Sequence, residues 1–367
     1  MTNSAWPQLD PALIEPLSAL RGHSAELDDA SHWPSDSLAV LGEAGVLGWV
    51  IPREYGGGEF SGSGLLEGYL QLARECLVST FVLTQRNAAC QRIAMSENES
   101  LKAELLPRLV SSDVFATVGI SHLTTSRQHL SRPAVEVKIE GSRLQLDGVV
   151  PWVTGAGQAD WVLTGGTCED GNQVLVVLPM DTPGISVLPA QELLALDSSQ
   201  TASIRLEGVS LDASQLVAGP VPGVMQSGGR GGTGSLGTSA LAVGAATACL
   251  DRLALEAEKR VDLCEVLEPL TRERDAVVSD LLAAAGETSV SESPELSNES
   301  LRQRSNSLVL RAAQAYLAAS KGAGFTASHP AARAVRESMF FLVWSCPQAV
   351  IAANLREFAG VLDGPGC

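Results

Sequence analysis

The 367-residue sequence lacks the features that mark several classes of protein. Its formal net charge is −17 and its pI is near 4.7, so no basic face is expected for the phosphates of a nucleic acid. The chain has no run of 18 apolar residues, and we expect no membrane span. Residues 1–7 have no basic region followed by an apolar one, so we expect no secretory signal.

The sequence also has few residues placed for metal or nucleophilic sites. Its seven cysteines are scattered, odd in number and without Cys-x-x-Cys spacing, which predicts reduced thiols in a cytoplasmic protein and neither disulfides nor zinc. His122 and His129 have no cysteine or acid at ligand spacing, so no metal is inferred. The absence of Gly-x-Ser-x-Gly argues against a nucleophile elbow.

The patterns that are present change twice along the chain. Residues 1–113 have helical periodicity, except for a short extended piece at 49–52. From 114 to 218, β-branched residues alternate with polar ones and Gly-containing turns recur. Residues 219–367 are helical again. We therefore predict an α+β multidomain protein with an N-terminal helical domain, a central β-barrel or sandwich domain and a C-terminal helical bundle.

The C-terminal region begins with a segment rich in glycine and proline, at 219–234. The sequence Gly-Gly-Arg-Gly-Gly-Thr-Gly within it lacks the Gly-Lys-Ser/Thr ending and the preceding strand of a phosphate loop. We interpret it as a flexible linker, with a lid over a site as the alternative. Helices are predicted at about 235–260, 266–285 and 299–321, with a final helical stretch from 330 to about 362.

The turn around Trp152 and Thr154 lies near the middle of the chain, between strand-like stretches. An exposed indole can lie against a planar ligand, while a threonine hydroxyl and strand amides bond the polar edge of its ring. The alternative is a tryptophan buried in a barrel turn. The turn is therefore a candidate binding platform.

Three separated motifs together resemble the acyl-CoA dehydrogenase family of flavoproteins. Leu-Gly-Glu-Ala-Gly-Val-Leu-Gly-Trp-Val-Ile-Pro-Arg-Glu-Tyr-Gly-Gly at 41–57 is similar to its N-terminal signature, and 147–154 to its Gly-x-Lys-x-Trp-Ile-Thr turn. Gly322-Ala-Gly324-Phe, followed by Arg336-Glu337, is similar to its Gly-rich turn and Arg-Asp helix. The resemblance covers residues 10–360, in the right order and spacing.

The resemblance implies a fold, a cofactor and a reaction. FAD lies between the β-domain and the helical bundle in this family, usually with a neighbouring subunit completing the site. A homodimer or homotetramer acting on a small molecule, an acyl-CoA, is therefore expected. The family oxidises the CH–CH group of an acyl thioester, and a Glu removes the α-proton while hydride passes to the flavin. The electron acceptor and the acyl chain length are not readable from the sequence.

The ring side of the implied flavin site is partly kept. Trp152 and Thr154 match the family positions that contact the flavin ring. Ser121 stands where the family has a Thr, so a hydroxyl is retained for the ring edge; the alternative is a strand serine satisfied by its own backbone. The Lys of the family's turn is Val150 here.

The phosphate side is more altered. Ser126 and Arg127 lie in a loop that replaces the family's acidic-Pro-x-Ala-Gly-Ser-Asp segment, and they are candidate phosphate contacts. The alternative is that they are solvated residues of a surface loop. Arg260 matches the Arg that reaches the FAD pyrophosphate, but the Phe-Gly that follows it in the family is absent. Gly322 and Gly324 retain the glycines of the Gly-rich turn. Arg260, Gly322 and Gly324 are candidate cofactor contacts.

The catalytic Glu of the family has no counterpart at its usual position. Ser345 stands there, and an alcohol without an activating partner cannot remove an α-proton at neutral pH. The candidate acids to replace the Glu are Asp251, Glu256 and Glu258, on the helix after the linker. Three hypotheses follow: an acyl-CoA dehydrogenase-like enzyme with a non-standard or absent base, a flavin-dependent monooxygenase or oxidase on the same fold, and a non-catalytic binding or scaffold protein.

Overall fold

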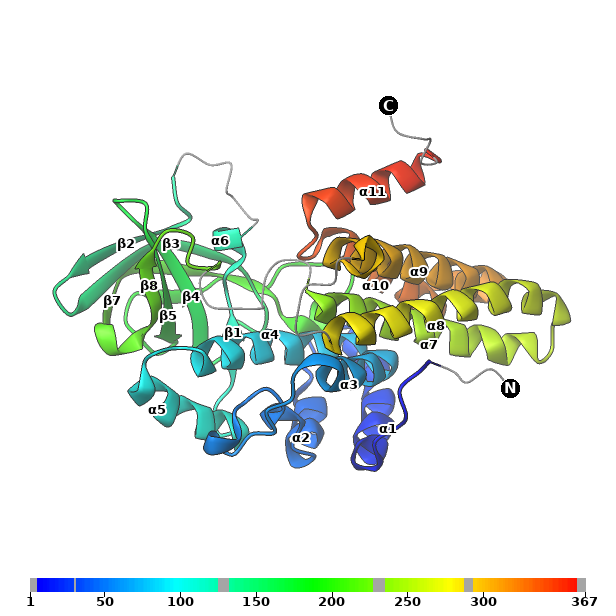
Figure 1. Cartoon of the computed structure of the whole chain (residues 1–367), viewed down its shortest axis with the longest axis horizontal. Helices are drawn as coiled ribbons and strands as arrows, with labels where there is room; N and C mark the ends of the chain where they lie inside the picture. The colour runs from blue at the N-terminus through cyan, green and yellow to red at the C-terminus, as the bar shows by residue number, and fades with distance from the viewer. Residues whose placement is uncertain (1–4, 30, 125–131, 227–234, 287–292, 362–367) are drawn as a thin grey trace. The chain divides into compact units, whose positions relative to one another are not determined.

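The computed structural model describes residues 5–29, 31–124, 132–226, 235–286 and 293–361 (Figure 1). Its contacts divide the chain into two compact units. We call them the helical unit (Met1–Asp28, Ser61–Thr80 and Thr233–Cys367) and the strand unit (Asp29–Phe60 and Phe81–Gly232). The predicted boundaries near 114 and 218 separate helical from strand-rich sequence, whereas this division falls among the N-terminal helices, which contribute to both units.

The helices before the sheet follow the predicted periodicity. They are α1 (Ile14–His23), α2 (Ser35–Glu43), α3 (Gly62–Glu75), α4 (Leu77–Ala94) and α5 (Glu99–Val110). The prediction of an extended piece at 49–52 was wrong for its first two residues, Trp49 and Val50, which lie in a hydrogen-bonded turn. Gly45 adopts a left-handed φ of 73°, and the chain then winds through a 3-10 turn that ends with Trp49 in the right-handed helical region. The glycine permits this turn because it has no Cβ to clash.

The strand unit contains one mixed sheet of eight strands, in the region where the alternating sequence predicted a β-barrel or sandwich. The strands are β1 (Ala116–Val118), β2 (Val135–Glu140), β3 (Arg143–Val153), β4 (Trp161–Cys168), β5 (Gln173–Pro179), β6 (Ile185–Val187), β7 (Ala202–Asp212) and β8 (Leu216–Val221). Their order is β6-β7-β3-β2-β4-β5-β8, with β1 parallel to β4. β8 extends three residues, 219–221, into the segment predicted as linker.

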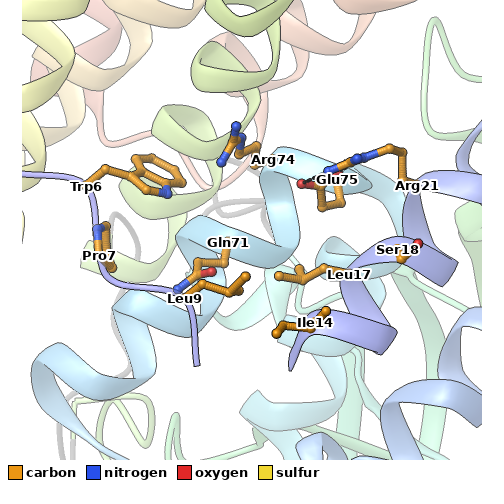
Figure 2. A pocket seen from close by; sticks show the side chains of 10 residues that line it. All are labelled: Trp6, Pro7, Leu9, Ile14, Leu17, Ser18, Arg21, Gln71, Arg74 and Glu75. Atoms are coloured by element: carbon orange, nitrogen blue, oxygen red, sulfur yellow. Dashed lines mark hydrogen bonds and ion pairs between the residues drawn. The ribbon is translucent and has the colours of Figure 1, made fainter. Parts of the chain in front are cut away.

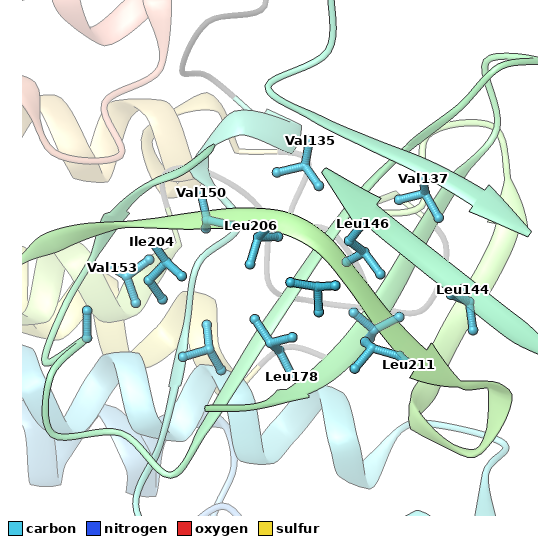
Figure 3. Packing of buried hydrophobic residues seen from close by; sticks show 14 of the residues in the cluster. Val135, Val137, Leu144, Leu146, Val150, Val153, Leu178, Ile204, Leu206 and Leu211 are labelled. Carbon is cyan, nitrogen blue, oxygen red and sulfur yellow. The ribbon is translucent and has the colours of Figure 1, made fainter. Parts of the chain in front are cut away.

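The core of the strand unit is built from one face of these strands. Val135, Leu146 and Ile204 lie on three different strands and are completely buried (Figure 3). Alternate residues of β2 and β3 point the other way and are exposed, because side chains alternate across a strand. Each such Val, Leu or Ile contributes roughly 1.5–3 kcal/mol by leaving water, so this core holds the turns at the strand ends in place.

The helical unit carries the C-terminal bundle. Its helices are α7 (Leu236–Ala257), α8 (Cys264–Gly286), α9 (Asn298–Ala319), α10 (Pro330–Val343) and α11 (Gln348–Phe358). The single stretch predicted from 330 to about 362 was wrong, because the helix breaks between Trp344 and Pro347. A proline has no N–H for the helix and disfavours the helical conformation of the residue before it. Ser345, within the break, has a left-handed φ of 45°.

Helix α7 packs closely on α3. A Cβ added at Gly244 would lie 2.7 Å from both the Leu70 carbonyl oxygen and the Ala73 Cβ, so the two backbones approach through the glycine. Within the described residues, Leu236–Ala257 is the one helix long and apolar enough to cross a membrane, and 67% of its most apolar 18-residue window is buried inside the structure. Such burial is the pattern of a core helix.

Candidate functional site

The Trp152 turn lies at an irregularity in the sheet. Val150 of β3 pairs with Ile204 of β7 and Val153 pairs with Ala202, so β3 holds one extra residue between these two pairs. This β-bulge places Trp152 at a left-handed φ of 56° and leaves its side chain 54% exposed. Bulges commonly re-aim a side chain next to a site. The buried-tryptophan alternative is therefore wrong, and the indole face is open to a ligand.

Thr154 lies two residues further along, and it is buried. Its hydroxyl is 3.4 Å from the Thr201 hydroxyl, which is 2.9 Å from that of Ser199. The next residue, Gly155, donates its N–H to the Ser199 carbonyl at 2.9 Å. An exposed indole beside a buried hydroxyl can hold a planar ring by its face and bond its polar edge.

A second aromatic residue supports the turn from below. A Cβ added at Gly155 would lie 2.4 Å from the Trp33 ring, and Gly155 has a left-handed φ of 64°. Trp33 in turn meets Phe115 edge to face, with ring centroids 5.6 Å apart. The backbone at Gly155 therefore rests directly on an aromatic pair, which limits where the Trp152 turn can move.

Ser121 reaches the same turn from another element. It begins the short helix α6 (Ser121–Thr124), so its interpretation as a strand residue was wrong. Its hydroxyl donates to the Pro151 carbonyl at 3.3 Å, one residue before Trp152. The structure thus brings three predicted residues, Ser121, Trp152 and Thr154, to one turn. Ser126 and Arg127 lie outside the described residues, as does the second half of the predicted linker, 227–234.

Arg260 and the Gly-rich turn also lie together, in the helical unit. The Arg260 guanidinium donates to the Ala319 carbonyl at 2.9 Å and pairs with Asp262 at 3.1 Å. Ala319 ends α9, immediately before the turn that holds Gly322 and Gly324. Gly324 is packed so tightly that a Cβ would meet Ser320 at 2.6 Å, whereas one at Gly322 would meet nothing within 4 Å. Arg260 therefore already has two partners within the chain.

Ser345 is held in place by a buried arginine that the sequence did not single out. Arg302 of α9 donates to the Phe341 carbonyl at 3.0 Å and the Trp344 carbonyl at 2.8 Å, at the end of α10. It also donates to the Asn306 side chain at 2.9 Å. These bonds satisfy helix carbonyls that have no partner within their own helix. They fix the break that contains Ser345.

The Arg302 guanidinium has an unusual environment. The residue is completely buried, and one of its terminal nitrogens, Nη1, has no hydrogen-bond partner among the described residues. Burial lowers the Arg302 pKa to about 10, and the thiol of Cys346 opposes this change. Burial raises the pKa of the Cys346 thiol. A residue such as Arg302 is hard to find by sequence, because its partners are backbone carbonyls about 40 positions away.

The acids considered as replacement bases lie on or beside α7. Asp251 pairs with Arg74 at 2.6 Å, and both side chains are partly exposed. Glu256 is half-buried, and Glu258 is exposed at the helix end. The structure therefore provides Asp251 with a cationic partner of its own, and the other two lie towards the end of the helix.

The helical unit also contains a pocket of about 330 Å³ beside α1 and α3 (Figure 2). Its charged side chains are paired: Arg21 with Glu75 at 2.6 Å, and Arg74 with Asp251. The Arg74 guanidinium lies 5.7 Å from the centre of the Trp6 ring. None of the residues predicted to contact a flavin lines this pocket, so it belongs to the packing of the N-terminal segment on α3.

The chain is similar to known proteins. Residues 18–113 match the family model of the acyl-CoA dehydrogenase N-terminal domain. A probable acyl-CoA dehydrogenase, YngJ of Bacillus subtilis, is 25% identical over 65% of this chain and 64% of its own length. Glutaryl-CoA dehydrogenase of Desulfococcus multivorans is 25% identical over 61% of this chain and 59% of its own. The matches thus span less than two thirds of these curated relatives.

Solved structures share the whole fold. A glutaryl-coenzyme A dehydrogenase bound to glutaryl-CoA has a TM-score of 0.79, 20% identity and 97% coverage of both chains. KijD3 in complex with FMN and a dTDP-sugar has a TM-score of 0.75 and 18% identity, covering 100% of this chain and 98% of its own. These likenesses confirm the predicted architecture. The N-terminal match and the curated relatives agree with the resemblance to the acyl-CoA dehydrogenase family, whose cofactor is FAD.

Proposed function

We propose that the protein is a FAD-dependent oxidoreductase that acts on the CH–CH group of an acyl thioester without a carboxylate at the family's usual position. The observation that carries the proposal is the β-bulge that turns the Trp152 indole outward beside the buried Thr154 hydroxyl. The left-handed backbone conformation of Trp152 costs about 1–3 kcal/mol, and such strained residues cluster at active sites and ligand-binding sites.

The chain's own residues would bind and orient the cofactor. Trp152 would cover the ring, and the hydroxyls of Thr154 and Ser121 would bond its polar edge. Gly322 leaves exposed backbone near Arg260, whereas Gly324 is buried, and Arg260 must exchange a present partner to reach a phosphate. Bound FAD would supply the hydride-accepting chemistry.

Removal of the α-proton is the step of this reaction for which no base has been assigned. Ser345 lies in a left-handed break whose neighbours Arg302 and Cys346 offer it no carboxylate or imidazole. An unactivated alcohol cannot act as the base. Asp251 is already paired with Arg74. The proton would therefore leave to another group, such as Glu256 or a water molecule.

The absence of a carboxylate at Ser345 also favours a second candidate. A flavin-dependent monooxygenase or oxidase needs no Glu at this position when reduced flavin itself performs the oxygen chemistry. A nitrososynthase from Micromonospora carbonacea shares the fold, with a TM-score of 0.75 and 17% identity. The choice between the two candidates rests on substrate, which an experiment decides.

The purified protein should be yellow, with the visible absorbance of bound FAD, and Trp152→Ala should weaken FAD binding. Anaerobic addition of an acyl-CoA panel should bleach this absorbance if a thioester is the substrate. Absence of bleaching, together with oxygen uptake driven by NADH or reduced flavin, would favour the second candidate. A colourless protein that takes up no added FAD would refute both enzymes and leave the non-catalytic binding or scaffold protein.

The missing base offers a second test. Ser345→Glu restores a carboxylate at the break, and Ser345→Gln has the same size without the charge. If an acyl-CoA is the substrate, Ser345→Glu should bleach at least about tenfold faster than Ser345→Gln, since a positioned base contributes about 10²–10⁴-fold when fully aligned. Equal rates for the two variants would argue against thioester oxidation at this break.

Assembly and location complete the proposal. We expect a homodimer or homotetramer in the cytoplasm, with a small-molecule substrate and no nucleic acid partner. Light scattering of the intact chain measures the assembly directly. A strictly monomeric protein that binds FAD would contradict the expected oligomer while leaving the flavin proposal in place.

A further inference from the structure

The segment 196–201 lies beneath the Trp152 turn and is held in an unusual conformation. Leu196 and Gln200 have left-handed φ values of 65° and 44°, although neither is glycine. Between them, Ser198 and Ser199 are completely buried. The Ser198 hydroxyl donates to the Asp29 carbonyl at 2.7 Å, which anchors the segment from outside the turn. Such conformations persist where the surroundings determine them strongly.

Two sets of bonds connect this segment to the turn. The Gly155 N–H donates to the Ser199 carbonyl at 2.9 Å, and this bond fixes the position of the turn's backbone relative to segment 196–201. The hydroxyls of Ser199, Thr201 and Thr154 form a chain, with an inner link of 2.9 Å and a longer outer link of 3.4 Å. All three residues are buried. The Thr154 hydroxyl, the candidate flavin contact, therefore ends a line of hydroxyl groups.

We propose that Ser199 and Thr201 are positioning residues that orient the Thr154 hydroxyl towards a bound flavin in both of its oxidation states. This inference rests on the proposed function and adds two residues to its site. Neither residue is expected to touch the flavin, and both would act through Thr154.

The reason is the direction in which each hydroxyl donates. A hydroxyl has one proton and can also accept, so the chain can run outward, leaving the Thr154 proton for a ring acceptor, or inward, with Thr154 donating to Thr201. Flavin reduction converts ring nitrogens from acceptors to N–H donors. Thr154 would then accept from the ring, and its own proton would need the Thr201 oxygen.

Removal of the Thr201 hydroxyl should therefore affect one oxidation state more than the other. With reduced flavin, the Thr154 proton would be left buried without an acceptor. With oxidised flavin, only an accepting lone pair of Thr154 would be lost, and unpaired buried donors are rarer in proteins than under-satisfied acceptors. Thr201→Val should weaken binding of reduced FAD about tenfold relative to oxidised FAD, the effect of one hydrogen bond. For a two-electron couple, this lowers the midpoint potential by about 30 mV.

The experiment has one arm with flavin and one without. With flavin, the midpoint potential and the Kd of oxidised FAD are measured for wild type, Thr201→Val, Thr201→Ser and Ser199→Ala. Thr201→Ser keeps the hydroxyl and should restore the wild-type potential. Ser96→Ala is the matched control, because Ser96 is an equally buried hydroxyl of the strand unit that bonds the Val217 carbonyl at 2.8 Å.

The flavin-free arm is a double-mutant cycle on stability, combining Thr154→Val with Thr201→Val in urea unfolding. Linked hydroxyls should give a coupling of at least about twofold in the unfolding equilibrium constant. The inference would be supported by coupling between Thr154 and Thr201, together with a midpoint potential that is lowered in Thr201→Val and has the wild-type value in Thr201→Ser. Additive stabilities, or a potential that moves no further than in Ser96→Ala, would overturn it. If the wild-type protein binds no FAD while the cycle shows coupling, the proposed function is refuted, yet Thr201 is supported as a positioning residue for Thr154.

Discussion

Substitution of Gly155 by alanine tests how the ring platform is built. Gly155 combines a left-handed φ of 64° with a Cβ position 2.4 Å from the Trp33 ring. The left-handed conformation costs an alanine about 1–2 kcal/mol. Overpacking against the rigid Trp33–Phe115 pair adds about 1–3 kcal/mol. We therefore expect Gly155→Ala to lower the free energy of unfolding by roughly 3 kcal/mol.

The turn itself offers a matched control. Gly157 lies two residues further on, has no positive φ, and a Cβ there would meet nothing within 4 Å. Gly157→Ala should change the free energy of unfolding by no more than about 0.5 kcal/mol. Urea unfolding of both variants measures the difference, and FAD titration should show weaker binding only for Gly155→Ala. Equal effects of the two substitutions would refute our account of the platform.

Trp33 provides an independent check on the cause. If the clash with its ring is the source of the loss, Gly155→Ala should cost less when Trp33→Ala is already present, because the space is then open. The left-handed conformation would remain as the residual cost. Additive effects of the two substitutions would place the loss in the backbone alone.

Three further predictions concern the helical unit. Burial raises the pKa of the Cys249 thiol to about 12. Because the unfolded thiol ionises first above pH 9, its contribution to stability is present below pH 9 and falls as pH rises towards 12. When pH is raised from below 9 to 10, the free energy of unfolding should therefore fall by about 1.4 kcal/mol less in Cys249→Ala than in the wild type, as measured by urea unfolding against pH. The same pH dependence in both proteins would contradict this. Arg302→Met should cost roughly 3 kcal/mol, because it removes the two hydrogen bonds that the buried guanidinium donates to the Phe341 and Trp344 carbonyls, and a loss under about 1 kcal/mol would argue against the capping role. Asp251→Asn should cost less than about 1 kcal/mol, since its partner Arg74 is partly exposed, and should leave the rate of flavin bleaching unchanged; a large fall in that rate would identify Asp251 as the base.

The amino-acid sequence by itself determined the order of elements and the place of the ring platform. Alternation such as Val135-Glu-Val-Lys-Ile predicts a strand because side chains of a strand alternate between two faces, and this pattern is local. Helical periodicity in α7, α8 and α9 is local in the same sense. The absence of a Glu at Ser345 is also a property of the sequence alone.

Tertiary structure decided how those local pieces become a site. The bulge at Trp152 depends on the register between β3 and β7, which lie about 50 residues apart. The break after α10 is capped by Arg302 through backbone carbonyls, which no sequence pattern records. The Ser199–Thr201–Thr154 chain arises because a strained segment packs under the turn. Register, capping and close packing are contacts between distant residues, and local periodicity carries no information about them.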